Sequence, residues 1–267
     1  MLLSQQIADH RMRQIFLDKK PQIVVNLAAQ AGVRYSIVNP YSYVESNLLG
    51  FSNILDLCQT HDVKHLVYAS SSSVYGANKE FPFSEEQKVD TPLSFYAATK
   101  ISNEMMAHAY SNIYNLPITG LRFFTVYGPW GRPDMALFLF IKSIINEKPI
   151  KVFNYGDMSR DFTYIDDIVN GTISALDHCP SKNDKVPHRI YNLGNDNPEK
   201  LVKLIEVIEK CTGKKALRNL EPMQLGDVKN TMADIERSKK DLNFHPKVKI
   251  EEGVPLFIDW YREYFRL

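Results

Sequence analysis

The chain has 267 residues, of which 44% are hydrophobic, so it can bury a sizeable core as one large domain or two smaller ones. Its 32 Lys and Arg residues nearly cancel its 31 Asp and Glu residues, and this balance provides no overall field that would attract nucleic acid or an anionic membrane. We therefore expect neither nucleic acid nor a membrane as a partner. Any anionic ligand has to be held by local charges.

The cysteine and histidine residues indicate no metal centre. Cys58, Cys179 and Cys211 lie far apart and form no CxxC pair, and the seven histidines contain no HExxH arrangement. No apolar run approaches the roughly 20 residues of a membrane-spanning helix, and the N-terminus has polar residues where a signal peptide is apolar. These features favour reduced thiols and a cytoplasmic location.

The first half of the chain alternates short apolar runs with longer amphipathic stretches. Runs rich in β-branched or aromatic residues at 23–28, 66–69 and 118–124 predict buried parallel strands. Helix signals predict helices at 39–60, where Asn39-Pro40 opens the segment, and at 94–114, where Ser94 does so. Strands that alternate with helices indicate an α/β fold with a doubly wound parallel sheet, covered on both faces.

The second half predicts a smaller lobe that packs over the carboxyl edge of the sheet, where open α/β sheets bind ligands. We assign residues 1–127 to the first domain, with 160–195 returning to it, and residues 128–159 and 196–267 to the lobe. The pattern predicts a turn-rich segment at 127–134, helices at 137–146, 164–176, 199–211, 235–242 and 252–264, and strands at 150–153 and 190–193.

Tyr96 and Lys100 lie four residues apart on one predicted helix, close in sequence to a serine run at 70–73. Residues four apart share a helix face, so the Lys100 ammonium can lower the pKa of the Tyr96 phenol from about 10 and make it a general base. A serine hydroxyl at the end of the preceding strand can orient the same substrate oxygen.

A tyrosine and a lysine four apart are usually only a surface pair, so their significance depends on the flanking segments. The sequence YASSSSVYG at 68–76 precedes them and LRFFTVYGP at 121–129 follows them. This order resembles the extended short-chain dehydrogenases, and especially the nucleotide-sugar 4-epimerases, over essentially the whole chain. The resemblance implies a Rossmann-like NAD-binding domain, a UDP-sugar substrate, a homodimer formed by the helices at 39–60 and 94–114, and Ser71, Tyr96 and Lys100 as catalytic residues.

The resemblance also implies cofactor contacts. The segment NLAAQ at 26–30 resembles the family's strand end beside NAD, and Asn47 matches its helix asparagine through the Asn-x-x-Gly spacing. An ordinary helix-surface amide is the alternative for Asn47. The implied NAD contacts are Ala28, Ala29, Asn47, Ser70, Tyr96, Lys100 and Phe123.

Two further segments resemble the family's nucleotide-sugar contacts. Arg160, in the segment GDMSRDF, corresponds to the arginine that grips the diphosphate, and its planar fork suits phosphate oxygens. The alternative is a salt bridge with Asp157 or Asp161. Gln224 and Asp227, in QLGD, resemble the later nucleotide-binding loop, although proline is commoner than leucine at position 225.

The chain departs from the family in one major feature. It has no Gly-x-x-Gly-x-x-Gly turn, since Gly128 and Gly131 are followed by Asp134, and it lacks the acidic residue expected about 20 positions later. The chain opens in what resembles the helix before the family's fourth strand. We therefore interpret the sequence as lacking the first two βα units, on the order of 60 residues.

The residues beside Ser71 distinguish the reaction types within the family. Dehydratases carry an Asp-Glu pair where this chain has Ser72 and Ser73, and uronic-acid decarboxylases carry a glutamate at position 73. Epimerisation needs no added acid, so a 4-epimerase is indicated, with Ser73 as a substrate contact.

Thr125 and Arg132 resemble the uronic-acid epimerases, whereas epimerases of neutral hexoses usually carry asparagine at position 125. Arg132 can pair with a sugar carboxylate and Thr125 can donate a hydroxyl, while Arg34 is a weaker second candidate. The alternative is that Arg132 pairs with Asp134 on a surface loop. We expect conversion of UDP-glucuronate to UDP-galacturonate by transient 4-keto oxidation; the alternatives are a UDP-glucose 4-epimerase and an inactive remnant that only binds nucleotide sugar.

Overall fold

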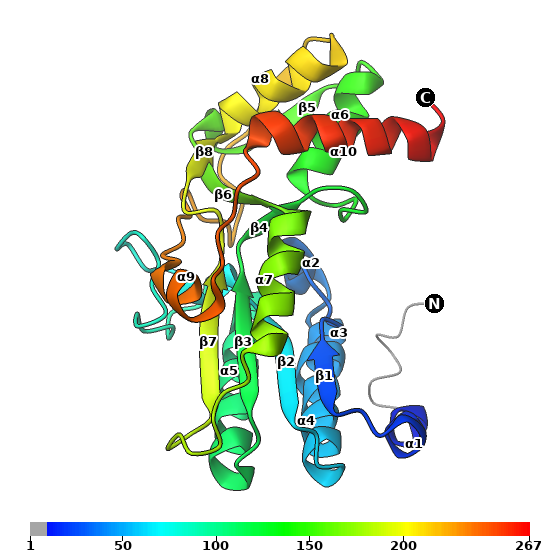
Figure 1. Ribbon diagram of the computed structural model, residues 1–267. Coiled ribbons are helices and arrows are strands. Elements are labelled where there is room, and N and C mark those ends of the chain that lie inside the picture. The colour runs from blue at the N-terminus through cyan, green and yellow to red at the C-terminus, as the bar shows by residue number, and fades with distance from the viewer. Residues whose placement is uncertain (1–9) are drawn as a thin grey trace.

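The structure is a computed structural model that describes residues 10–267. After helix α1 (His10–Lys19), four parallel strands form a sheet in the order β1-β2-β3-β7. They are β1 (Ile23–Asn26), β2 (His65–Ser71), β3 (Ile118–Phe123) and β7 (His188–Leu193), as Figure 1 shows. The predicted parallel α/β sheet is confirmed. The expectation of no signal peptide concerns an N-terminal segment that lies outside the described residues.

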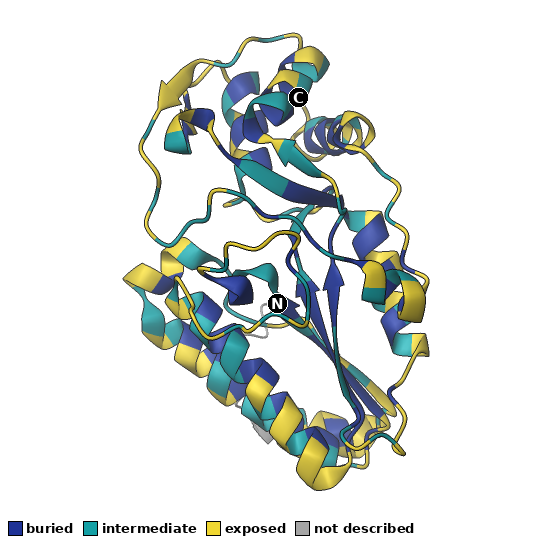
Figure 2. Cartoon of the chain, turned by 90° about the vertical axis from the view of Figure 1, so that its left-hand side faces the viewer, coloured by how far each residue is buried: buried dark blue, intermediate teal, exposed yellow. Residues whose placement is uncertain are grey.

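Helices lie on both faces of this sheet. Helices α4 (Gly50–Thr60) and α5 (Phe95–Tyr114) cover one face, and α7 (Ile165–Asp177) covers the other (Figures 1 and 2). Helix α5 begins where the sequence predicts, because the Ser94 hydroxyl accepts a hydrogen bond from the backbone N–H of Ala97 at 3.1 Å. This cap fixes the first turn of the helix, which holds Tyr96.

The single helix expected at 39–60 is interrupted. It consists of α3 (Pro40–Tyr43), a π-helical segment η1 (Val44–Leu49) and α4, and a short helix α2 (Val33–Val38) precedes it. The π segment contains Asn47, and such segments are frequent at functional sites. Apolar spacing does not report a local widening of the helix, so the sequence did not predict it.

Strand β1 departs from the expected coverage of both faces. Its only strand partner among the described residues is β2. The side chains of Ile23, Val25 and Leu27 are each more than two-fifths exposed, and they alternate along the strand and its continuation. One face of β1 is therefore apolar and open, while β2 and β3 beside it are buried.

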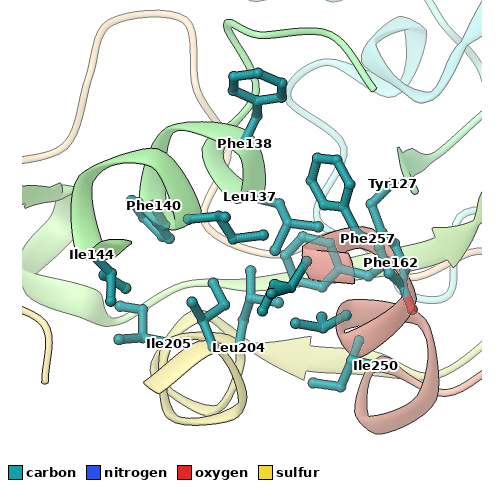
Figure 3. Close-up of a cluster of buried hydrophobic side chains, with 14 of the residues drawn as sticks. Tyr127, Leu137, Phe138, Phe140, Ile144, Phe162, Leu204, Ile205, Ile250 and Phe257 are labelled. Carbon is teal, nitrogen blue, oxygen red and sulfur yellow. The ribbon is translucent and has the colours of Figure 1, made fainter. Parts of the chain in front are cut away.

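The second lobe forms a separate apolar core. Figure 3 shows Leu137 and Phe140 from α6, Leu204 and Ile205 from α8, and Phe257 from α10 in one cluster. The lobe contains helices α6 (Ala136–Ile145), α8 (Leu201–Thr212) and α10 (Ile250–Phe265), a sheet of β4 (Thr125–Tyr127), β6 (Ser159–Tyr164) and β8 (Pro198–Lys200), and the pair β5 (Ile150–Val152) and β9 (Arg218–Leu220). Strands β4, β6, β8 and β9 were not predicted, because most are three residues long and show no alternation.

One buried carboxylate ties β6 to the segments that connect the lobe to the sheet. Asp161 is fully buried and accepts hydrogen bonds from the backbone N–H groups of Asn195 at 2.5 Å, Asp196 at 3.1 Å and Ala233 at 2.9 Å. Helix α9 (Glu236–Leu242), which follows, contacts β7 and α7. The division into domains at 127, 159 and 195 stays a prediction, since β6 and α9 join the two parts.

Two properties of the described residues bear on possible partners. None of the helices in residues 10–267 is long and apolar enough to span a bilayer. In the same part of the chain, no three His, Cys, Asp or Glu side chains are grouped closely enough to hold a metal ion.

Candidate active site

Ser71, Tyr96 and Lys100 meet at the carboxyl end of β2. Ser71 is the last residue of that strand, and its hydroxyl lies close enough to the Tyr96 phenol to lower the phenol's pKa by hydrogen bonding. Ser71 Oγ also accepts hydrogen bonds from the backbone N–H of Ser73 at 3.2 Å and from the Ser73 hydroxyl at 3.0 Å. The predicted catalytic residues and Ser73 are thus brought together by the end of β2, the 3-10 turn Ser72–Tyr75 that follows it, and the first turns of α5.

Lys100 is almost completely buried, with 4% of its surface exposed. Its ammonium donates a hydrogen bond to the carbonyl oxygen of Ala69 at 2.7 Å and lies 5.9 Å from the centre of the Tyr96 ring. Burial lowers the pKa of Lys100 to about 8, and the Glu104 carboxylate opposes that shift. Lys100 is therefore a lysine whose charge can change near neutral pH.

The expected lowering of the Tyr96 pKa is not seen. Burial raises the pKa of Tyr96 above its usual value, and the Ser71 hydrogen bond and the charge of Arg132 only partly offset that effect. Lys100 directs its ammonium to the Ala69 carbonyl, so it contributes less to the phenol than its spacing suggested. In this state Tyr96 is a neutral phenol that donates a proton, and it needs a further cation or a bound reactant to become a base.

Arg132 lies on the loop that follows β4. Its Nε and Nη2 donate to the two carboxylate oxygens of Asp134 at 3.0 Å and 2.5 Å, and 44% of its side chain is exposed. This is the surface pair considered above as the alternative. The loop nevertheless brings the guanidinium into the neighbourhood of Tyr96, because its charge lowers the pKa of Tyr96, and it packs against Gly32, where a Cβ would lie 3.1 Å from its Nη2.

Arg160 and Asp227, both expected to contact substrate, bind each other. The Arg160 Nη2 donates to Asp227 Oδ1 at 2.7 Å, and its Nη1 donates to the backbone oxygens of Ser159 at 2.9 Å and Lys229 at 2.8 Å. The alternative pairing of Arg160 with Asp157 or Asp161 is wrong. Asp161 accepts the backbone N–H groups described above, and Asp157 pairs with Lys229 at 2.6 Å.

The loop that carries Gln224 and Asp227 lies against the start of α5. A Cβ on Gly226, whose φ is +75°, would lie 3.1 Å from Val33 and 3.2 Å from the Leu93 carbonyl oxygen. The carbonyl oxygen of the Gln224 side chain is buried without a hydrogen-bond partner. An unpaired buried acceptor is costly, so this atom is suited to receive a donor from a ligand.

Asn47 and Ser70 make protein contacts rather than facing open space. Asn47 Oδ1 accepts from the Gln30 backbone N–H at 2.8 Å, and its Nδ2 donates to the Gln30 carbonyl and to Thr99 Oγ1, both at 3.0 Å. Asn47 is 1% exposed, so the alternative of a helix-surface amide is wrong. Ser70 is also buried, and its hydroxyl donates to Glu104 at 2.6 Å.

The remaining expected contacts lie at the carboxyl ends of strands. Ala28 and Ala29 follow β1, whose hydrogen-bonded part ends at Asn26, and Ala28 is exposed. Phe123 ends β3 and Thr125 begins β4, and both are partly buried. The carboxyl edge of the sheet therefore gathers residues from β1, β2, β3 and the loops after them, as open α/β sheets do at ligand sites.

Residues 5–194 match the profile of the NAD dependent epimerase/dehydratase family. The chain belongs to this family. It is 52% identical over 268 residues to Protein CapI of Staphylococcus aureus, and this match spans 96% of the chain and 80% of that protein. It is 46% identical to a Probable UDP-glucuronate 4-epimerase of Rhizobium meliloti, over 92% of the chain and 76% of that protein.

A solved structure of the same family is also similar. The crystal structure of UDP-glucuronic acid 4-epimerase from Bacillus cereus in complex with UDP-glucuronic acid and NAD superposes with a TM-score of 0.89 and 34% sequence identity. This match covers 97% of the chain and 80% of the Bacillus chain. This member of the epimerase/dehydratase family therefore shares the Rossmann-type fold of the Bacillus enzyme.

Sequence reasoning missed one group of residues beneath the family's catalytic segment. Glu104 and Arg122 form a fully buried ion pair next to Ser70, and Arg122 also contacts Tyr75. The four-residue spacing from Lys100 to Glu104 could have indicated that Glu104 faces the same side of α5. No local signal identifies Arg122 as its partner, because the pair joins a helix to the next strand.

Proposed function

We propose that this chain is an NAD-dependent 4-epimerase of a UDP-sugar, and that it interconverts UDP-glucuronate and UDP-galacturonate in the cytoplasm. The observation that carries the proposal is the cluster of Ser71, Tyr96 and Lys100 at the end of β2, with the cation of Arg132 beside it. The relatives named UDP-glucuronate 4-epimerase support both the reaction and the acidic sugar.

The residues at the carboxyl edge fit one end of NAD. Lys100 and Tyr96 offer an ammonium and a hydroxyl that suit a ribose, and the partly buried Phe123, which pairs with Ser71 across the strands, offers a flat ring at the same edge. When bound, NAD supplies the reversible hydride acceptor for the sugar's C4. The exposed loop around Ala28, which follows β1 at the same edge of the sheet, is a further proposed contact for NAD.

Tyr96 would move the proton. Its ionised form, a phenolate hydrogen-bonded to Ser71, would accept the proton of the sugar 4-hydroxyl as C4 is oxidised and return it when C4 is reduced on the other face. Ser71 holds the same oxygen in both steps. Lys100, whose pKa is lowered to about 8 by burial, would provide a positive charge 5.9 Å from the Tyr96 ring that helps to stabilise the phenolate before it takes the proton and after it returns it.

The acidic sugar is to be recognised by Arg132 and Thr125. A carboxylate that leaves water loses hydration worth several kcal/mol and needs a cation with hydrogen-bond donors to offset the loss. Arg132 already holds the carboxylate of Asp134 through two hydrogen bonds, so its guanidinium is arranged for bidentate binding. We propose that the sugar carboxylate replaces Asp134.

Arg160 and the loop at 224–227 are the proposed contacts to the UDP part. Arg160 is held by two backbone carbonyls and by Asp227, so its position is fixed while one partner is a side chain that can move. Diphosphate oxygens suit such a guanidinium. The unpaired side-chain oxygen of Gln224 is placed to accept a hydrogen bond from the nucleotide.

We also propose a homodimer formed by α3, α4 and α5. Tyr41 on α3, Leu49 on the η1 segment that joins α3 to α4, and Met105 and Ile113 on α5 are large apolar residues and are exposed. Covering them would remove apolar area from water. Light scattering at micromolar concentration should give twice the chain mass, and a monomer would count against this assignment.

The function is tested by supplying the chain with UDP-glucuronate and millimolar NAD and following the sugar ring by proton NMR. Appearance of UDP-galacturonate is expected. The alternative substrate is UDP-glucose, which the pairing of Arg132 with Asp134 favours because the cation is already neutralised. Equal conversion of both sugars would move the assignment to neutral hexoses, and no conversion of either at saturating NAD would contradict the enzymatic proposal.

A further inference from the structure

A buried ion pair lies directly beneath the catalytic cluster. Glu104 on α5 is 0% exposed and Arg122 on β3 is 3% exposed. The Arg122 Nε donates to Glu104 Oε1 at 2.9 Å and its Nη2 donates to Oε2 at 2.7 Å, so the pair is bidentate. No step of the proposed reaction uses either residue.

Hydrogen bonds extend from this pair in two directions. The Ser70 hydroxyl donates to Glu104 Oε1 at 2.6 Å, which ties the carboxylate to the strand residue before Ser71. Arg122 Nη1 donates to the Tyr75 phenol oxygen at 3.0 Å, and Tyr75 donates to Asn192 Oδ1 at 2.6 Å. The network therefore links α5 with β2, β3, β7 and the turn after β2.

The spacing on α5 gives this network its significance. Tyr96, Lys100 and Glu104 are four residues apart, and such residues lie on one face of a helix. The three side chains reach three consecutive residues at the end of β2, because Tyr96 contacts Ser71, Lys100 contacts Ala69 and Glu104 contacts Ser70. Glu104 is the only one of the three that the reaction leaves unused.

The choice of charged residues is informative because it is costly. Moving two charged groups from water into the protein interior costs desolvation free energy, which offsets much of their electrostatic attraction. Well-packed apolar residues of similar size therefore often stabilise a protein as well as a buried ion pair, or better. A bidentate pair adds direction, since it is satisfied in only one relative position of helix and strand. The Glu104 charge also opposes the lowering of the Lys100 pKa by burial.

We propose that Glu104 is a positioning residue. Paired with Arg122, it holds the end of β2 in register with α5, so that Ser71 and Lys100 keep their places beside Tyr96. This inference rests on the proposed function for its kinetic consequences, but the position of the Tyr96 phenol can be measured without turnover.

The test compares three variants with the unmutated chain. Glu104→Gln removes the negative charge and keeps the shape of the side chain. If the unpaired Arg122 cation prevents that variant from folding, the double variant Glu104→Gln with Arg122→Met removes both charges. The matched control is Glu209→Gln on α8, because Glu209 is 7% exposed and pairs with Lys215 and Arg218 far along the chain from the catalytic segment. Circular dichroism establishes which variants fold.

The first readout is the pH titration of Tyr96, followed by NMR of ¹³Cζ-tyrosine and assigned with Tyr96→Phe. If Glu104 positions the site, the Tyr96 midpoint moves to higher pH in both Glu104 variants, because the Ser71 hydrogen bond that lowers the phenol's pKa is weakened. Glu209→Gln leaves it unchanged. An unshifted midpoint in a folded Glu104 variant overturns the proposal whether or not the chain turns over a UDP-sugar.

The second readout is kinetic. With UDP-glucuronate and excess NAD, we expect kcat to fall roughly tenfold or more in both Glu104 variants with little change in KM, since a displaced catalytic group slows the chemical step. Folded Glu104 variants that keep the kcat of the unmutated chain would also overturn it. If the unmutated chain shows no turnover, the proposed function fails while the NMR comparison still decides the role of Glu104.

Discussion

Arg132 and Asp134 form a two-point ion pair whose cation lowers the pKa of Tyr96, with Nε–Oδ1 and Nη2–Oδ2 distances of 3.0 Å and 2.5 Å. The carboxylate that the pair contains is a chemical copy of the sugar carboxylate that we expect to bind there. Substitution of the two residues should therefore have opposite effects on substrate binding. Arg132 would bind the sugar carboxylate, whereas Asp134 would compete with that carboxylate for Arg132.

Arg132→Ala should reduce kcat/KM for UDP-glucuronate about 10- to 100-fold more than for UDP-glucose, since a hydrogen bond to a charged group contributes roughly 1.5–3 kcal/mol, while the loss of its charge near Tyr96 affects both sugars alike. Asp134→Asn should lower the KM for UDP-glucuronate. Steady-state kinetics with both sugars measure the preference. The control is Arg189→Ala, which removes another partly exposed arginine that pairs with Asp184. Equal losses on both sugars in Arg132→Ala would contradict the specificity role.

Tryptophan fluorescence should report the proposed replacement of Asp134 by the sugar carboxylate at Arg132. The chain has two tryptophans, and the rings of Trp130 and Trp260 lie 5.5 Å apart. Trp130 is two residues before Arg132 on the same loop, so we expect a movement of this loop to change the surroundings of its ring. Titration with UDP-glucuronate should change the emission, and Trp130→Phe should remove most of that change. A full response in Trp130→Phe would place the movement elsewhere.

Tyr96→Phe should abolish epimerisation while UDP-sugar binding stays nearly intact, because one phenolic oxygen is lost with little contact area. Isothermal titration calorimetry with UDP-glucuronate measures the binding, and the NMR assay measures the rate. Tyr43→Phe is a suitable control, since Tyr43 packs edge-on against the Tyr96 ring and its phenol bonds backbone carbonyls instead. A Tyr96→Phe rate above roughly a tenth of the unmutated rate would require another general base.

NAD should bind this chain with an affinity weaker than micromolar. The 267 residues contain no Gly-x-x-Gly-x-x-Gly turn, and helix N-termini behind such turns normally bind the pyrophosphate. Calorimetric titration with NAD measures the affinity directly. Micromolar binding would mean that contacts near Ala28, Asn47 and Lys100 suffice.

Acid should destabilise the protein partly through His188. Burial, with further effects from His108, Arg122 and Arg189, lowers its pKa to about 3, and its ring contacts the Tyr68 phenol at 3.2 Å. The unfolded chain binds this proton near pH 6.5, so the stabilisation is complete above that pH and decreases as the pH falls from about 6.5 toward 3.

When the pH is lowered from 7.5 to 5, we expect the contribution of His188 to the free energy of unfolding to fall by about 1–2 kcal/mol. This value allows for the partial exposure of His188 to solvent. Urea unfolding at several pH values measures it. His188→Gln should flatten the dependence, whereas His178→Gln, which changes an exposed histidine, should not. An identical pH dependence in His188→Gln would exclude this source.

The amino-acid sequence by itself determined the parallel strands, the start of α5 at the Ser94 cap and the grouping of Tyr96 with Lys100. These features depend on periodicity, on capping side chains and on four-residue spacing, all of which act within a few residues of the chain. The order of the flanking segments also identified the family, which the match over residues 5–194 confirmed.

Only the tertiary structure decided which charges meet. Arg160 pairs with Asp227 and Glu104 with Arg122 because loops and strands that are distant in sequence are packed together. The same packing buries Lys100 and partly buries Tyr96, so desolvation shifts their pKa values more strongly than the neighbouring charge that the sequence suggested. Burial depends on every element around a side chain, and no local pattern contains that information.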